Sequence, residues 1–200
     1  MEWDHLFADL EGQLAAEWEA ERAALDAESE RLRISRLTMR DRLRSMAAAA
    51  ARISLELADG SRWDCTLRAT GADWAGVALP ADPRLRIVPL TSDAAIDVDH
   101  GTLLSSLDED AAGDGSSLRS RMTFGFVLRD LARRRTPVTV GHRGADPQHG
   151  SIDRAGADHL DLALHDPGEP RRSRAVRGFR VIPFDAVVWV RVESGRTAAS

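Results

Sequence analysis

Lysine, asparagine and tyrosine are absent from the 200 residues, and cysteine occurs once, as Cys65. A single cysteine excludes an intramolecular disulfide and is typical of a reducing compartment, so we expect a cytoplasmic protein. Because there is no lysine, every fixed side-chain cation is an arginine, which favours bidentate pairing with carboxylates or phosphates. We expect Cys65 to be a small buried side chain, since Gly150 takes its place in the repeat described below.

Long hydrophobic runs are lacking too. No apolar stretch approaches the ~20 residues that a membrane span needs, so we expect no membrane partner. The opening residues 1–10 carry acids and no basic start, which argues against a signal peptide.

Catalytic signatures are also missing from the sequence. It contains no G-x-S-x-G, no Walker loop and no dinucleotide fingerprint, so we expect neither an enzyme nor a cofactor. His142, Asp146 and His149 fall within eight residues but lack the tight spacing of a zinc site. We interpret them as a polar hairpin loop and expect no metal.

The formal net charge of −5 hides a strong segregation of charge. Residues 1–30 hold ten acids and one base, and residues 31–52 hold seven arginines and one acid. An acidic total argues against general affinity for nucleic acid, but arginine-rich zones remain.

Residues 2–46 read as helix, because they contain no proline, one glycine, and mostly alanine, leucine, glutamate and arginine. An apolar residue recurs every seven positions, which is typical of a coiled-coil seam between subunits; its members are Trp18, Leu25, Leu32 and Met39. Glu21 and Glu28 occupy the second position of the heptads, so a bent helix or a helical hairpin is an alternative. The stripe could equally cover the chain's own domain.

Two segments are nearly the same: TGADWAGVAL at 70–79 and AGADHLDLAL at 155–164. Aligning them at an offset of 85 also aligns LRSMA at 43–47 with LRDLA at 128–132, and ISLEL at 53–57 with VTVGH at 138–142. This pattern indicates an internal duplication.

Each copy reads as a helix followed by five short strands. Alternating apolar residues in 53–57 precede the turn signal Asp59-Gly60, and the GAD segments predict tight turns that place Trp74 and His159 at a rim. Pro89 and Pro183 fall in short apolar strands, which should begin, bend or lie at an edge there. We therefore predict an α+β fold: a long N-terminal helix, then two tandem small five-stranded barrels of SH3 or Sm type, each preceded by a helix.

Each copy resembles an Sm-like barrel, with the first carrying I-x-L-x-L-x-D-G at 53–60. The layout is similar to that of an actinobacterial tandem-barrel family that opens with W-D-x-L-F-x-D-L-E, here residues 3–11; that family has no assigned function, and some members are labelled transcriptional regulators. The resemblance implies the barrel alone. The base-reading residues of Sm proteins do not transfer, because the chain has no asparagine and its final loops have no Arg-Gly pair.

The expected division is a long helix at 1–50, a first barrel at 51–105 and an acidic Gly/Ser linker at 106–121. A helix at 122–135 with the second barrel then fills 122–192, and 193–200 form a frayed tail.

Two arginine groups are candidate anion contacts. The first group lies at the end of the second expected helix, and the other group lies in a loop of the second barrel. Together they are Arg133, Arg134, Arg135, Arg171, Arg172, Arg174 and Arg177. They either contact nucleic acid or pair with the acidic surfaces of the protein itself, of the same or another subunit. The leading hypothesis is a non-enzymatic binding or scaffold protein that self-associates or docks through its N-terminal helix. The alternative is a nucleic-acid-binding regulator.

Overall fold

The computed structural model describes residues 2–92, 95–108, 118–168 and 175–193. The chain divides into two compact units, Met1–Thr38 and Met39–Ser200. The 109–117 part of the expected linker and residues 194–200 of the expected tail lie outside the described residues.

The first unit is one helix, α1 (Glu2–Arg36), of 35 residues. At a rise of 1.5 Å per residue it extends for about 52 Å. Exposed ion pairs one turn apart, Arg31–Glu28 and Arg33–Glu30, support its last turns. The sequence predicted helix up to residue 46, but α1 ends at Arg36, and α2 (Met39–Ala48) begins after a break at Leu37-Thr38.

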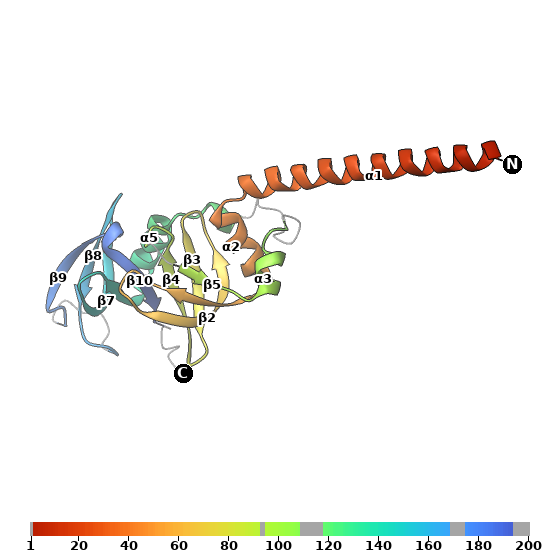
Figure 1. Ribbon diagram of the computed structural model, residues 1–200. Coiled ribbons are helices and arrows are strands. Elements are labelled where there is room, and N and C mark those ends of the chain that lie inside the picture. Colours follow the sequence, from red (N-terminus) through yellow and green to blue (C-terminus); the bar gives the residue numbers. More distant parts are fainter. Residues whose placement is uncertain (1, 93–94, 109–117, 169–174, 194–200) are drawn as a thin grey trace, which may run out of the picture. The chain divides into compact units, whose positions relative to one another are not determined.

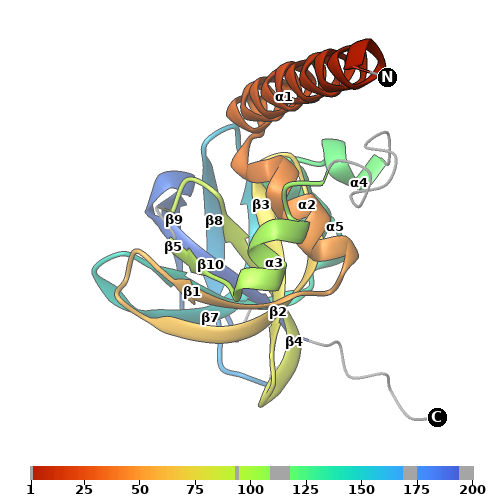
Figure 2. The same ribbon diagram turned by 45° about the vertical axis from the view of Figure 1, so that its right-hand side comes forward.

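In the second unit, the first half of the sheet comprises β1 (Arg52–Glu56), β2 (Arg62–Thr70), β3 (Trp74–Leu79), β4 (Asp82–Pro89) and β5 (Ala95–Asp97). Helix α2 packs on β2, and α3 (His100–Ser105) lies beside α2 (Figure 2). Arg42 of α2 donates to the Ser106 hydroxyl at the end of α3 at 2.9 Å. No sequence signal had predicted α3.

The second half of the sheet comprises β6 (Pro137–His142), β7 (Ala145–Ala155), β8 (His159–Leu164), β9 (Gly178–Pro183) and β10 (Val187–Val192), with the 3₁₀ turn η2 (Phe184–Ala186) before β10. It follows α4 (Leu118–Arg121) and α5 (Phe124–Arg134), and α5 packs on β7. Helix α5 confirms the helix expected at 122–135, while α4 falls in the expected linker.

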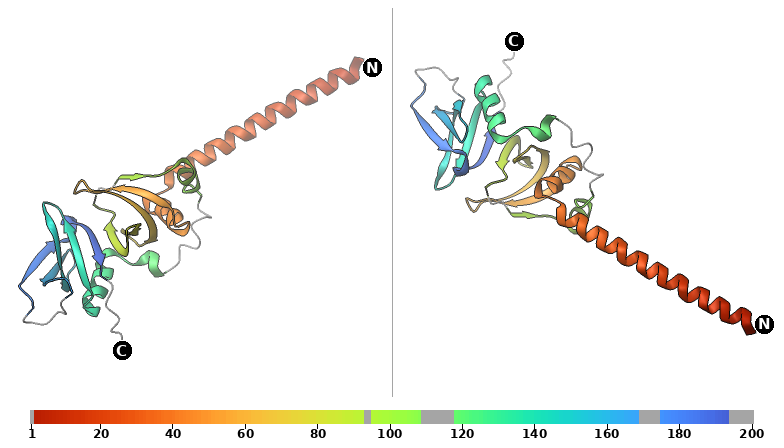
Figure 3. Two further views of the ribbon diagram at one scale, coloured as in Figure 1. Left: turned by 90° about the horizontal axis from the view of Figure 1, so that it is seen from below. Right: turned by 90° about the horizontal axis from the view of Figure 1, so that it is seen from above.

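The predicted pair of separate five-stranded barrels is wrong. The ten strands of the described residues form a single antiparallel sheet that does not close, in the order β5-β1-β2-β3-β4-β10-β6-β7-β8-β9. The strands of the two halves lie next to one another in Figures 1 and 3. Strand β10 pairs with β6 of its own half and with β4 of the other half, where Val190 lies opposite Ile87. Because β4 takes β10 as its neighbour, the first half has no closed barrel.

The two halves also share their cores. β10 is buried on both faces, since Val187 and Val190 join the core of the second half while Val188 and Trp189 join that of the first. In the opposite direction, Ile87 and Trp74 of the first half belong to the core of the second. Neither half therefore completes its core alone.

The two GAD turns are built alike. The Gly71 N–H donates to the Trp74 carbonyl at 2.9 Å, and the Gly156 N–H donates to the His159 carbonyl at 2.9 Å. A Cβ at Gly71 would lie 2.0 Å from the Trp74 Nε1, so glycine is needed there. The strands β4 and β9 both end at their prolines, Pro89 and Pro183. We expected these strands to begin, bend or lie at an edge there; β9 does lie at an edge of the sheet, but β4 is an internal strand.

The packing of Trp189 of β10 against Gly141 of β6 can be tested by substitution. A Cβ at Gly141 would lie 2.2 Å from the Trp189 ring, so we expect Gly141→Ala to lower the free energy of unfolding by about 1–3 kcal/mol. Denaturant unfolding measures the change. The matched control is Gly178→Ala on β9, where a Cβ meets nothing within 4 Å; an equal loss in the two variants would contradict this packing.

Candidate functional site

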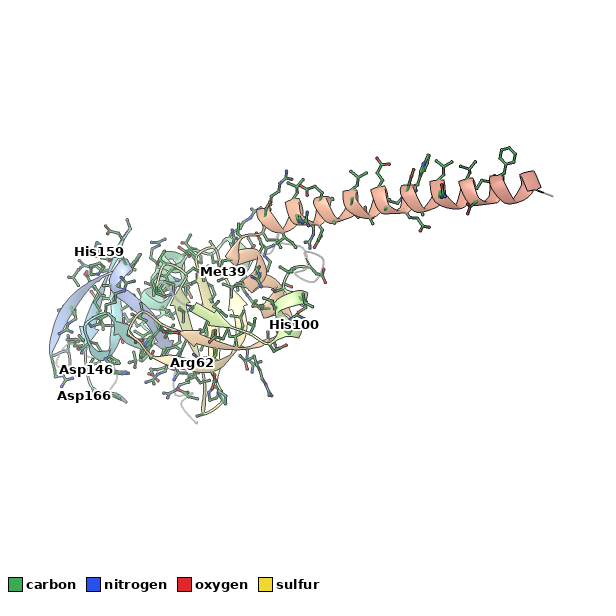
Figure 4. All side chains as sticks on the ribbon, in the orientation of Figure 1. Met39, Arg62, His100, Asp146, His159 and Asp166 are labelled. Carbon is green, nitrogen blue, oxygen red and sulfur yellow. The ribbon has the colours of Figure 1, made fainter. Side chains whose placement is uncertain are left out.

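The apolar residues of α1 are exposed along one side of the helix. Trp18, Leu25 and Leu32 have 68, 66 and 52% of their surface exposed, and Phe7, Leu10 and Leu14 are exposed as well. Successive members are three, four or seven residues apart, so they form one row, which we call the α1 stripe. The side chains of α1 that Figure 4 draws project outward from the helix.

Met39 does not continue this stripe. It is the first residue of α2 and belongs to the second unit, so the seven-residue recurrence crosses from one helix to another. The side chain of Met39 is half exposed. The structure therefore places three of the four predicted seam residues on one helix.

The arginines at the end of α5 have carboxylate neighbours. Arg133 and Arg134 both pair with Asp130, at 2.6 and 2.7 Å, and the Arg133 hydrogen bond helps to lower the pKa of Asp130. Arg135 is the C-cap of α5 in a left-handed conformation, with a φ of 52°. The positive charge of this group suits the carboxyl end of the helix.

In the second arginine group, Arg171, Arg172 and Arg174 lie outside the described residues. Arg177 is described, and its guanidinium pairs with Asp166 at 3.0 Å, with both side chains exposed. The structure thus places Arg177 beside a carboxylate and does not bring it together with the arginines of α5.

A cluster of charged side chains at the junction of the two halves was not predicted from the sequence. Asp82 accepts from Arg84 and Arg86 at 2.7 Å each, and Glu193 accepts from Arg84 at 2.5 Å and from Arg191 at 2.7 Å. Glu193 follows β10 and was assigned to a frayed tail, but its side chain is only 14% exposed. It joins the two halves through Arg84.

The carboxylates of this cluster stay ionised near neutral pH. Hydrogen bonds from Arg84 hold the pKa of Asp82 well below its ordinary value. Burial alone would raise the pKa of Glu193, but hydrogen bonds from Thr139 and Arg191 outweigh burial and lower it. Carboxylates that are ionised and paired in this way are poor proton donors and acceptors. The ion pairs of the cluster instead link β4 to β10 and to Glu193.

Histidines collect on the second half, though not as a metal site. His149 and His165 stack edge to face with ring centroids 5.2 Å apart, and His165 bonds the Ser151 hydroxyl at 2.9 Å. Burial, and then the proximity of His165, lower the pKa of His149. Among the described residues, no group of three or more His, Cys, Asp or Glu side chains is placed to hold a metal ion.

Two further expectations have opposite outcomes. Cys65 is buried, as expected, and burial raises the pKa of its thiol to about 11, which keeps it protonated.

Trp74 is not a rim residue: it is buried and its Nε1 donates to the Met122 carbonyl at 2.9 Å. His159 is half exposed beside Asp158, at the opposite end of the second half from Asp146 and Asp166 (Figure 4).

A cavity of about 560 Å³ lies where the two GAD turns approach the start of α5. Asp73 and Asp158, equivalent residues of the two turns, both line it. Asp73 accepts from the Phe124 N–H at 2.6 Å and thereby caps α5, while Asp158 accepts from His159. Asp185 also lines the cavity, so its lining includes three carboxylates, of which Asp73 and Asp158 have a hydrogen-bonding partner described above.

Comparison with protein-family models, with curated proteins and with solved structures finds no match to this chain. Within the described ranges, no helix is long and apolar enough to cross a membrane.

The pairing of Arg177 generates a test of the nucleic-acid hypothesis. We expect generic RNA or DNA to bind weakly near physiological salt, with no change when Arg171, Arg172, Arg174 and Arg177 are all replaced by Ser. For Arg177 the reason is that a guanidinium already paired with Asp166 gains less from a phosphate. Fluorescence anisotropy at several salt concentrations measures this. Submicromolar binding whose log–log salt slope falls by roughly 0.7–0.9 per lost contact in the variant would favour nucleic acid instead.

Proposed function

We propose that this protein is a non-enzymatic binding or scaffold protein that self-associates, or docks on a protein partner, through the α1 stripe. The observation that carries the proposal is the exposure of the stripe on a helix that forms a unit of its own. An apolar row rimmed by charged side chains is characteristic of a protein–protein contact.

The energetics of a lone helix support this reading. Most of the stability of a protein helix comes from packing its apolar face against something else. The described hydrogen bonds and ion pairs between side chains of α1 are local and exposed, such as Arg33–Glu30, and water screens each of them, so they stabilise the helix little. Covering the stripe with a second protein surface would therefore stabilise α1 considerably.

The second unit is a single well-packed body. Its two cores are shared across β10, and its charged junction is fully paired. The single buried thiol supports a cytoplasmic location as part of the proposal. The proposal includes no catalysis. The Asp82 carboxylate is paired and the Cys65 thiol is protonated, so neither of these two groups is an activated nucleophile.

The test introduces a carboxylate into the stripe. Leu25→Glu or Leu32→Glu should raise the dissociation constant of the assembly by about 30-fold or more, equivalent to roughly 2 kcal/mol, because a carboxylate would be buried in an apolar contact. Light scattering and sedimentation across concentrations measure the assembly, and thermal unfolding checks that the sheet stays folded.

The matched control is Ala23→Glu, which adds the same charge about 200° around the helix from Leu25. It should leave the assembly intact. An unmodified protein that is monomeric at every concentration, and that captures no protein partner through α1, would refute the proposal.

A further inference from the structure

An apolar groove on the second unit offers a surface that fits the α1 stripe. It encloses about 580 Å³ between the outer side of α5 and the strands β2–β4, and its walls are formed by Ala69, Trp74, Leu85, Met122, Phe126 and Val127. Phe126 is 50% exposed, although it sits beside the buried Phe124. This is the volume of a site that holds a small ligand or a few side chains.

The floor of the groove is shaped by a glycine. A Cβ at Gly76 would lie 3.1 Å from Leu85, 3.3 Å from Trp74 and 3.5 Å from Ala69. Because glycine has no side chain, the space between these three groove residues stays open. Trp74 is held in place by its hydrogen bond to Met122. The groove therefore has fixed, preformed walls.

The charged residues that line the groove belong to α4 and α5. Arg119 and Arg134 stand at its rim with Asp130, which also pairs with Arg133, so three arginines and one aspartate give a local charge of +2. Residues 1–30, which carry most of the stripe, hold ten acids and one base. The two surfaces are complementary in both charge and polarity.

The pattern of the stripe favours a groove over a second α1 as its partner. Glu21 and Glu28 lie three or four residues from Trp18, Leu25 and Leu32, hence on the same face of α1. Two α1 helices packed side by side would place these carboxylates in their seam, at a cost in desolvation. A groove that takes a single row of side chains leaves them at its rim, beside the arginines.

We propose that the groove receives the α1 stripe of a second copy of this chain, with Trp18 as the side chain that enters it. Trp18 is the largest side chain of the stripe, and buried tryptophans dominate the energy of many protein contacts. Two copies that each give α1 to the other form a closed dimer. The inference rests on the proposed function and names the surface that α1 meets.

The experiment uses full-length protein and sedimentation across concentrations. Phe126→Glu in the groove and Trp18→Glu in the stripe should each weaken the dimer at least about 30-fold. Phe179→Glu, the same change at an exposed phenylalanine of β9, is the matched control and should leave the dimer unchanged. Near-ultraviolet circular dichroism checks the fold, and Leu85→Asp replaces Phe126→Glu if that variant unfolds.

Mixing the two variants provides the decisive measurement. The Phe126→Glu copy keeps its stripe and the Trp18→Glu copy keeps its groove, so the mixture should form a dimer at concentrations where neither variant alone does. A dimer that Leu25→Glu breaks while both groove variants leave it intact would overturn this inference and preserve the proposed function. A monomeric unmodified protein would overturn the inference together with self-association.

Discussion

Strand β10 is the constraint on which the rest of the second unit depends. It is hydrogen-bonded on both edges, to β4 and to β6, and buried on both faces. Val187 and Val190 fill one core while Val188 and Trp189 fill the other. A strand with no free edge and no exposed face cannot move without disturbing both halves, so the ten strands behave as one body.

The surroundings of β10 reinforce this arrangement. Arg84 of β4 and Arg191 of β10 share Glu193, directly after the strand, and Gly141 leaves room for the Trp189 ring. On the other side of the unit, the Asp73 carboxylate caps α5, and Arg129 of α5 donates to the Gly156 carbonyl of the second GAD turn. The polar groups at these joints thus hold elements of the unit together.

Local features of this fold were predictable from the sequence, whereas long-range ones were not. Alternating apolar residues located β1 and β6, Pro183 indicated that β9 lies at an edge, and the alignment with Gly150 indicated that Cys65 is buried. The pairing of Val190 with Ile87 joins residues about a hundred positions apart, and no local pattern encodes which edge β10 will take. Glu193 was missed because its neighbours have the composition of a tail, and the break at Leu37-Thr38 carries neither proline nor glycine.

The central claim is that the α1 stripe is covered by another protein surface, and hydrogen exchange measured at several protein concentrations tests it most directly for self-association. Amides of α1 should become more protected as the concentration rises, because the helix gains its packing partner only in the assembly. Amides of β6 and β10, in the shared sheet, should show the same protection throughout. Protection of α1 that is equally strong at the lowest and highest concentrations would contradict the account.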